Sequence, residues 1–219
     1  MRNTNGRRNG LAGALLVAGG VLAGAGAADA ATPAGVADLG GAEFTKAGVP
    51  VSVPALAPCA VEGPTDATSD AVAKTGLTFG GGTSSCTTEV TDPANDVTKT
   101  TSTATGKDFE LSALVSAGGR RIKLASYTVT CTGVQGQTSA DWTFSGLAGI
   151  TDLPSPVPVN YAKPLTKTDG TVLATAVFNS QTLPGNGSIS LTMLRIDFAP
   201  ASGVSGSVTV GHTACAPTP

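Results

Sequence analysis

Apolar and polar residues alternate most regularly between residues 137 and 145. The apolar face of this segment consists of Thr138, Ala140, Trp142 and Phe144. Successive side chains of a β-strand point to opposite faces, so a period of two predicts a strand with one face in the core. We expect Trp142 and Phe144 to point inward from a central strand and to pack near Leu191 and Ile196.

Similar short runs, rich in β-branched residues and separated by Gly, Pro, Asn and Asp, occupy most of the chain after residue 47. Such residues favour strands and turns, and about nine to eleven strands are expected, with no helix after residue 30. The expected strands cover residues 49–54, 71–79, 86–91, 97–105, 107–117, 121–132, 137–145, 171–182, 188–198 and 206–212. This pattern predicts an all-β fold, an antiparallel β-sandwich that is either immunoglobulin-like or jelly-roll-like, with a closed barrel as the alternative.

Four local features refine this prediction. Pro50 and Pro54 cannot donate to a strand ladder, so residues 49–54 are expected at a sheet edge or in an extended arm. In residues 121–132 the apolar phase changes near Ala125, which suggests a β-bulge. A second change of phase falls between Met193 and Leu194. Residues 58–69 are expected to form a loop.

The first thirty residues have the three parts of a secretory signal peptide. Arg2, Arg7 and Arg8 precede an uncharged run over residues 11–27, and residues 28–30 (Ala-Asp-Ala) form a small-x-small cleavage site. The run is short and rich in glycine for a membrane span. We therefore expect a signal peptide at residues 1–30, a flexible segment at 31–46 and a single β-sandwich domain at 47–216. The Arg7-Arg8 pair leaves both the general secretory and the twin-arginine routes open.

The charge of the chain argues against a nucleic-acid partner. The chain has 13 Lys+Arg and 15 Asp+Glu residues, for a net charge of −2. Loss of residues 1–30 removes three basic residues and one acidic residue, leaving 10 basic, 14 acidic and a net charge of −4. No long basic cluster is present, so we expect no nucleic-acid partner.

The four cysteines, Cys59, Cys86, Cys131 and Cys215, all follow the expected signal peptide. An oxidising compartment favours disulfides, so two bonds and no free thiol are predicted. The residues alone leave all three pairings open.

Several segments resemble, in order and spacing, a family of actinobacterial secreted proteins called choice-of-anchor P. The similar segments are residues 122–132 (IKLASYTVTCT), 139–147 (SADWTFSGL), 179–181 (NSQ), 189–198 (ISLTMLRIDF) and 210–215 (VGHTAC). Ser180 and Arg195 depart from the family's acidic residue and histidine. The chain also ends at residues 216–219 without a sorting motif, so no stable membrane anchor is expected.

The resemblance implies an extracellular β-domain, and it implies no catalytic activity or ligand. Because Cys131 and Cys215 match the family's cysteines, it favours a Cys131–Cys215 bond. The remaining bond is then Cys59–Cys86.

Candidate chemistry is sparse. His212 is the only histidine and could serve a Ser-His-Asp arrangement, but no nucleophile-elbow motif is present, so we expect a partly exposed strand residue. Asp92, Asp96 and Asp169 stand in turns, where Asp satisfies the turn backbone instead of forming a carboxylate pair or a calcium site. His212 and the four cysteines could ligate zinc, but no Cys-x₂-Cys pair is present. No catalytic, cofactor-binding or metal-ligating residue is expected.

The sequence thus favours a secreted or cell-wall-associated β-domain with a non-catalytic structural or binding role and an extracellular or cell-wall partner. The alternatives are a secreted hydrolase with a dispersed active site and a small inhibitor-like binding protein.

Overall fold

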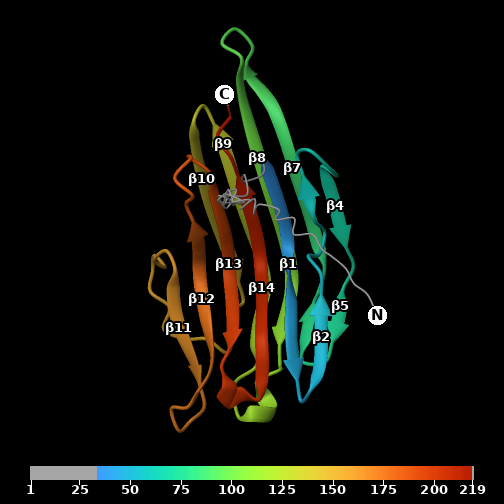
Figure 1. Ribbon diagram of the computed structural model, residues 1–219, viewed down its shortest axis with the longest axis vertical. Coiled ribbons are helices and arrows are strands. Elements are labelled where there is room, and N and C mark those ends of the chain that lie inside the picture. The colour runs from blue at the N-terminus through green and yellow to red at the C-terminus, as the bar shows by residue number, and fades with distance from the viewer. Residues whose placement is uncertain (1–33, 219) are drawn as a thin grey trace, which may run out of the picture. The chain divides into compact units, whose positions relative to one another are not determined.

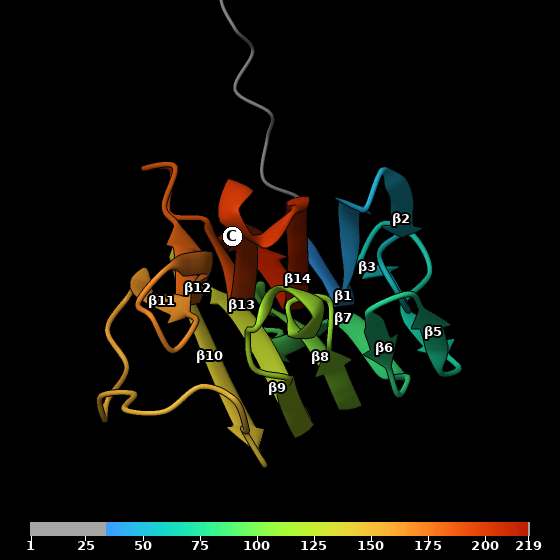
Figure 2. The same ribbon diagram turned by 90° about the horizontal axis from the view of Figure 1, so that it is seen from below.

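The computed structural model describes residues 34–218, which form two antiparallel sheets packed face to face as a β-sandwich (Figures 1 and 2). The first sheet has the strand order β11-β12-β13-β14-β1-β2, with β3 paired to β1. The second has the order β10-β9-β8-β6-β5, with β7 paired to β8 and β4 to β7. The predicted fold class is confirmed. The expected signal peptide at residues 1–30 lies outside the described residues.

The strands of each sheet come from separate parts of the chain. The first sheet contains β1 (Gly35–Lys46), β2 (Val49–Val53), β3 (Cys59–Ala60), β11 (Tyr161–Thr166), β12 (Val172–Thr182), β13 (Ile189–Phe198) and β14 (Val204–Cys215). The second contains β4 (Asp66–Ser69), β5 (Val72–Lys74), β6 (Leu77–Phe79), β7 (Gly82–Asp92), β8 (Val97–Leu111), β9 (Ile122–Val134) and β10 (Gln137–Ser145). Two 3₁₀ turns, η1 (Val115–Ala117) and η2 (Pro200–Ser202), complete the described elements. Within residues 34–218 no helix is long and apolar enough to cross a membrane.

The expectation of a flexible segment at residues 31–46 is wrong, because Gly35–Lys46 forms β1 inside the first sheet. This strand pairs with β14 on one side and with β2 and β3 on the other. Its residue Leu39 is fully buried. The segment lacks an apolar signal because close packing requires small residues: Gly40 has φ 110°, and a Cβ there would meet the backbone of Thr209. Beside it, β2 is a sheet edge, as its prolines predicted.

Both predicted changes in the alternation of buried and exposed residues, near Ala125 and near Met193, are present in the structure. Neither arises from a bulge in a single strand. In the first sheet, a row of residues has no registered ladder partner, although the register continues unchanged on either side. We call this row the crease; it consists of Asn179, Met193, Gly211 and Leu39. The second sheet has a similar site, where Ala125 lies opposite Asp108 (φ 48°), again with no shift in register. The single-strand bulge expected at Ala125 is therefore wrong, since both strands deviate together.

Tyr127 of β9 joins the two sheets through the core. It is 2% exposed, and its hydroxyl donates a hydrogen bond of 2.8 Å to the carbonyl oxygen of Leu39 in the crease. A Cβ at Gly106 would collide with the Tyr127 ring, which explains a glycine within β8. The sequence suggested that Gly106 separates two strands. Instead, β8 runs continuously through Gly106.

The environment of Trp142 differs from the prediction. Trp142 and Phe144 do face the core, but β10 is an edge strand and both side chains are only partly buried. Their rings stack with centroids 5.7 Å apart, and each lies 6.5 Å from the ring of Phe178 in β12. Alternation identified the facing of the strand correctly. Its place at the edge depends on which strands pair, which alternation does not encode.

Both disulfides connect one sheet to the other. Cys59 of β3 bonds to Cys86 of β7, and Cys131 of β9 bonds to Cys215 of β14. All four cysteines are buried. The pairing implied by the family resemblance is confirmed. The residues expected to form a loop at 58–69 include the short strands β3 and β4, and Cys59 in β3 provides one of these links.

Candidate functional site

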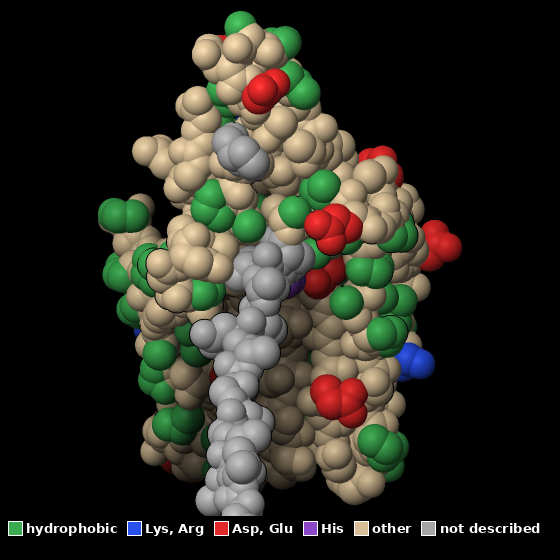
Figure 3. Space-filling model, turned by 45° about the horizontal axis from the view of Figure 1, so that its top comes forward, with side chains coloured by type: hydrophobic (Ala, Val, Ile, Leu, Met, Phe, Trp, Pro, Cys, Tyr) green, Lys and Arg blue, Asp and Glu red, His purple; other side chains and the backbone are tan. Residues whose placement is uncertain are grey.

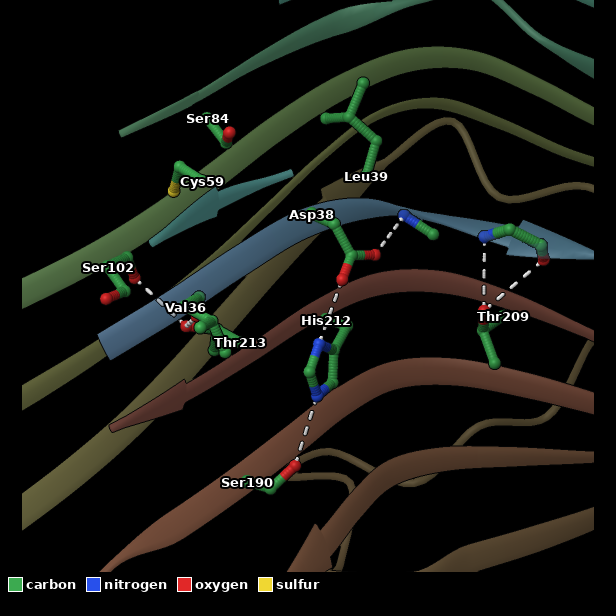
Figure 4. Close-up of polar contacts among 12 residues, drawn as sticks. Val36, Asp38, Leu39, Cys59, Ser84, Ser102, Ser190, Thr209, His212 and Thr213 are labelled. Carbon is green, nitrogen blue, oxygen red and sulfur yellow. Dashed lines mark hydrogen bonds and ion pairs between the residues drawn. The ribbon is translucent and has the colours of Figure 1, made fainter. Parts of the chain in front are cut away.

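Three polar side chains from adjacent strands meet on the outer face of the first sheet (Figure 4). Asp38 lies on β1, His212 on β14 and Ser190 on β13. Asp38 and His212 are direct partners in the ladder, whereas Ser190 lies two residues before Thr192, the partner of His212 on the other side. The pairing of these three strands therefore brings the three side chains together.

The contacts form a continuous hydrogen-bonded chain. His212 Nδ1 lies 3.0 Å from Asp38 Oδ2, and His212 Nε2 lies 3.2 Å from Ser190 Oγ. In the tautomer with its proton on Nδ1, His212 donates to the Asp38 carboxylate and its Nε2 accepts from the Ser190 hydroxyl. This connectivity is that of a Ser-His-Asp triad.

The backbone fixes one end of this chain. The second oxygen of Asp38, Oδ1, accepts a hydrogen bond of 2.8 Å from the N–H of Gly40. The side chains of Asp38 and His212 are 18% and 32% exposed. The carboxylate is therefore held from two directions, while the imidazole remains open to solvent on one side.

A shallow hollow of about 400 Å³ lies beside Asp38 and His212. The hollow is lined by Asp38, Gly41, Ala42, Glu43, Ser52, Val53, Pro54, Ala55, Thr192, Ser207, Thr209 and His212. Its polar lining consists mainly of hydroxyl groups and the carboxylates of Asp38 and Glu43. Ser190 does not line the hollow, so a molecule held there would contact the histidine without facing the serine.

The backbone around Ser190 does not supply an oxyanion hole. β13 pairs at Ser190 with Thr182 of β12 on one side and with Ala214 of β14 on the other. N–H groups of a strand paired on both sides point within the sheet at neighbouring strands. Acyl transfer needs donors aimed at the oxyanion of the substrate, which here would lie above the sheet. The Asp38–His212–Ser190 contacts can thus polarise the serine hydroxyl, while the backbone N–H groups at Ser190 are directed toward the neighbouring strands.

Burial, followed by the negative charge of Asp38, raises the pKa of the Tyr127 hydroxyl above the ordinary tyrosine value. A buried phenolate would lose its hydration and would face a carboxylate, so the neutral form is strongly favoured. Tyr127 therefore stays a hydrogen-bond donor to Leu39, the residue that follows Asp38 in β1.

The other residues considered in the sequence have structural roles. The four cysteines are consumed in disulfides and offer no thiolate to zinc. Asp92 accepts hydrogen bonds from Ala94 N and Asn95 Nδ2, and the side chain of Asn95 contributes most to lowering its pKa. Asp169 similarly accepts from Thr171 N. The turn interpretation of Asp92 and Asp169 is confirmed.

Sequence reasoning found His212 but missed Asp38 and Ser190 as its partners. Asp38 lies in the segment expected to be flexible, so no strand was available to place it beside β14. Ser190 is one of many serines in the chain, and only the pairing of β13 with β14 distinguishes it.

The fold and the disulfides define the chain as a disulfide-bonded antiparallel β-sandwich domain, of a kind suited to an oxidising environment. Comparison with family models, curated proteins and solved structures finds no match for this chain.

Proposed function

We propose that this chain is a secreted extracellular or cell-envelope-associated domain with a non-catalytic binding role, and that the hollow beside His212 contributes to its binding surface. The resemblance to choice-of-anchor P proteins and the pattern of residues 1–30 support export. Two buried disulfides that link the sheets support a rigid domain for an oxidising medium.

The observation that carries the binding role is the separation of the hollow from Ser190. A shallow surface lined by hydroxyls and carboxylates can hydrogen-bond a polar ligand, while the one candidate nucleophile lies outside it. The face seen in Figure 3 is mostly polar side chains and backbone with scattered hydrophobic side chains, and two acidic side chains lie close together near the histidine. Such a surface favours contact with a polar, hydroxyl-rich partner such as a wall polysaccharide.

Co-sedimentation with purified cell walls tests this role. Thr192 lines the hollow, so Thr192→Arg should fill it and reduce the bound fraction. Thr143→Arg on the exposed face of β10 is the matched control and should bind like wild type. Equal binding by both variants would remove the hollow from the proposal, and absence of wild-type binding would contradict the wall-binding role.

The hydrogen-bonded chain of Asp38, His212 and Ser190 specifically favours a second candidate, a serine hydrolase. A fluorophosphonate probe that reacts with activated serines separates the two functions. Under the binding proposal, wild type and Ser190→Ala should show the same negligible labelling. Labelling that both Ser190→Ala and His212→Asn abolish would establish the hydrolase instead.

A further inference from the structure

A second cavity, which shares no lining residue with the hollow, opens at one end of the sandwich. We call it the end pocket. It has a volume of about 290 Å³ and lies between the turn that follows η1, the loop at residues 149–152 and strand β11 with its hairpin. Figure 2 shows this end of the molecule, with the η1 region in yellow-green and β11 at the edge of the first sheet. The buried side chains of Leu114, Ile122 and Leu173 form its apolar wall.

Three basic residues line the end pocket: Arg120, Lys163 and Lys167. Lys163 lies on the same side of β11 as Tyr161 and Leu165, which pack against the core. Lys167 follows at the same spacing, and Arg120 comes from the turn after η1. Positive charge therefore reaches the cavity from two different elements.

These basic residues are not neutralised by ion pairs. The ion pairs found among residues 34–218 are Lys99–Glu89, Arg121–Glu110, Lys123–Glu110, Arg195–Asp197 and His212–Asp38. Arg121 pairs with Glu110, whereas its neighbour Arg120 has no such partner. Asp152 is the only acidic residue lining the end pocket. The pKa of the nearby Asp169 is lowered mainly by its hydrogen bonds with Thr171 and to a smaller extent by the charge of Lys167. The end pocket keeps an excess of positive charge in a chain whose net charge is negative.

We propose that the end pocket binds a small oxyanion, a carboxylated or phosphorylated molecule about the size of one monosaccharide. Guanidinium and ammonium groups form charge-assisted hydrogen bonds with carboxylates and phosphates, and these are stronger than neutral ones. The cavity volume lies near the lower end of the usual range for ligand sites, about 300 Å³. The anionic group would contact the lysines and Arg120, and the body of the ligand would lie against Ile150 and Leu165, apolar lining residues that keep some exposed surface.

A purely structural explanation covers only part of this arrangement. Inward-pointing charges on an edge strand hinder pairing with another chain, and β11 is an edge strand. This accounts for Lys163 and Lys167. It does not account for Arg120, which belongs to a different segment and faces the same cavity.

The test is titration of protein expressed from the full chain with glucuronate, glucose 6-phosphate, neutral glucose and inorganic phosphate, followed by amide chemical shifts. The Lys163→Gln/Lys167→Gln variant removes two charges from the pocket. Lys74→Gln/Lys107→Gln removes two exposed charges from the second sheet and is the matched control. Thermal unfolding of both variants establishes that they fold.

We expect saturable shifts at Gly118 and Gly149 with at least one of the two sugar anions. Wild-type protein should bind neutral glucose at least about tenfold more weakly than it binds the sugar anion, a difference of about 1.4 kcal/mol. The pocket variant should bind the sugar anion more weakly than wild type by at least the same factor, whereas the control variant should match wild type. The identity of the stronger sugar anion distinguishes a carboxylate from a phosphate ligand.

Three results would overturn the proposal. The first is absence of shifts with either sugar anion, and the second is equal binding by the pocket variant and the control. The third is inorganic phosphate binding as tightly as both sugar anions, which would show a general anion effect without a site for a sugar-sized ligand. Self-association of the pocket variant, combined with unchanged anion binding, would instead assign the lysines to protection of the sheet edge.

Discussion

Removal of the Cys131–Cys215 disulfide should destabilise the protein more than removal of the Cys59–Cys86 disulfide. Both bonds join the two sheets, and all four cysteines are buried, so the local packing losses are comparable. The bonds differ in the length of chain that they close: 84 residues for Cys131–Cys215 and 27 for Cys59–Cys86. A longer closed loop restricts the unfolded chain more.

The chain-entropy relation sets the magnitude. It gives a stabilisation of about 4.6 kcal/mol for the longer loop and about 3.6 kcal/mol for the shorter, a difference of about 1 kcal/mol. The two loops do not overlap in sequence, so the losses should add to about 8 kcal/mol. A typical domain has about 5–15 kcal/mol of total stability, so loss of both bonds should bring the fold close to unfolding at room temperature.

The variants are Cys59→Ala/Cys86→Ala, Cys131→Ala/Cys215→Ala and the quadruple combination. Alanine is preferable to serine, since a buried hydroxyl without a partner adds its own cost. Urea unfolding, followed by far-ultraviolet circular dichroism, gives the free energy of unfolding for each variant. Wild-type protein under a strong reductant provides an independent control that should match the quadruple variant.

An equal or reversed order of the two double variants would refute the loop-length argument. It would mean that native packing around each bond, instead of restriction of the unfolded chain, sets its contribution. Losses that do not add would show that the unfolded chain retains contacts between the two loops.

The remaining predictions concern the core and the crease. Tyr127→Phe leaves a buried carbonyl without its donor and should cost about 1–3 kcal/mol in urea unfolding, while Tyr161→Phe, which removes no observed hydrogen bond, should cost little. Because the pKa of Tyr127 is raised in the folded state, its contribution to the free energy of unfolding is complete below about pH 10 and is lost as the pH rises further. Thermal unfolding across this range should therefore show a smaller loss of stability for Tyr127→Phe than for wild type. Gly40→Ala should cost at least about 2 kcal/mol through collision with the neighbouring strand, whereas Gly136→Ala, also at positive φ but in open space, should cost about 1 kcal/mol or less; equal costs would contradict the collision. Trp142→Ala, at a partly buried edge position, should cost no more than about 3 kcal/mol, and a larger loss would show a central role.

Local pattern predicted those parts of the fold that local physics determines. The alternation over residues 137–145 gave the correct facing of Trp142 and Phe144, and Asp92 and Asp169 form the turns that their positions suggested. Pro50 and Pro54 correctly indicated an edge strand. Each of these features depends on the pleat, on backbone donors or on turns within a few residues.

Features that depend on pairing between distant segments were not predictable in the same way. Alternation could not show that β10 is an edge strand, because that requires knowing which strand lies beside it. The change of phase near Ala125 was visible, but it was interpreted as a bulge in one strand, since the matching irregularity at Asp108 lies in β8. The cysteine pairing came from family resemblance, and the residues alone left three alternatives.

Strand β1 (Gly35–Lys46), whose sequence gave the weakest pattern, contributes both to the packing of the fold and to the candidate site. Within β1, Asp38 positions His212, the carbonyl of Leu39 accepts the Tyr127 hydroxyl, and Gly40 both donates to Asp38 and permits close contact with β14. These roles explain why the segment has so little apolar pattern: small residues allow backbones to approach, and its polar partners Tyr127 and His212 lie 88 and 174 residues further along the chain. Perturbation of Gly40 should therefore disturb sheet pairing and the Asp38–His212 contact together, whereas perturbation of Ser190 should disturb only the hydrogen bond at the end of that chain. If the hollow binds the ligand, substitution of Gly40 should reduce binding and substitution of Ser190 should not. A hydrolase would instead lose activity on substitution of either residue.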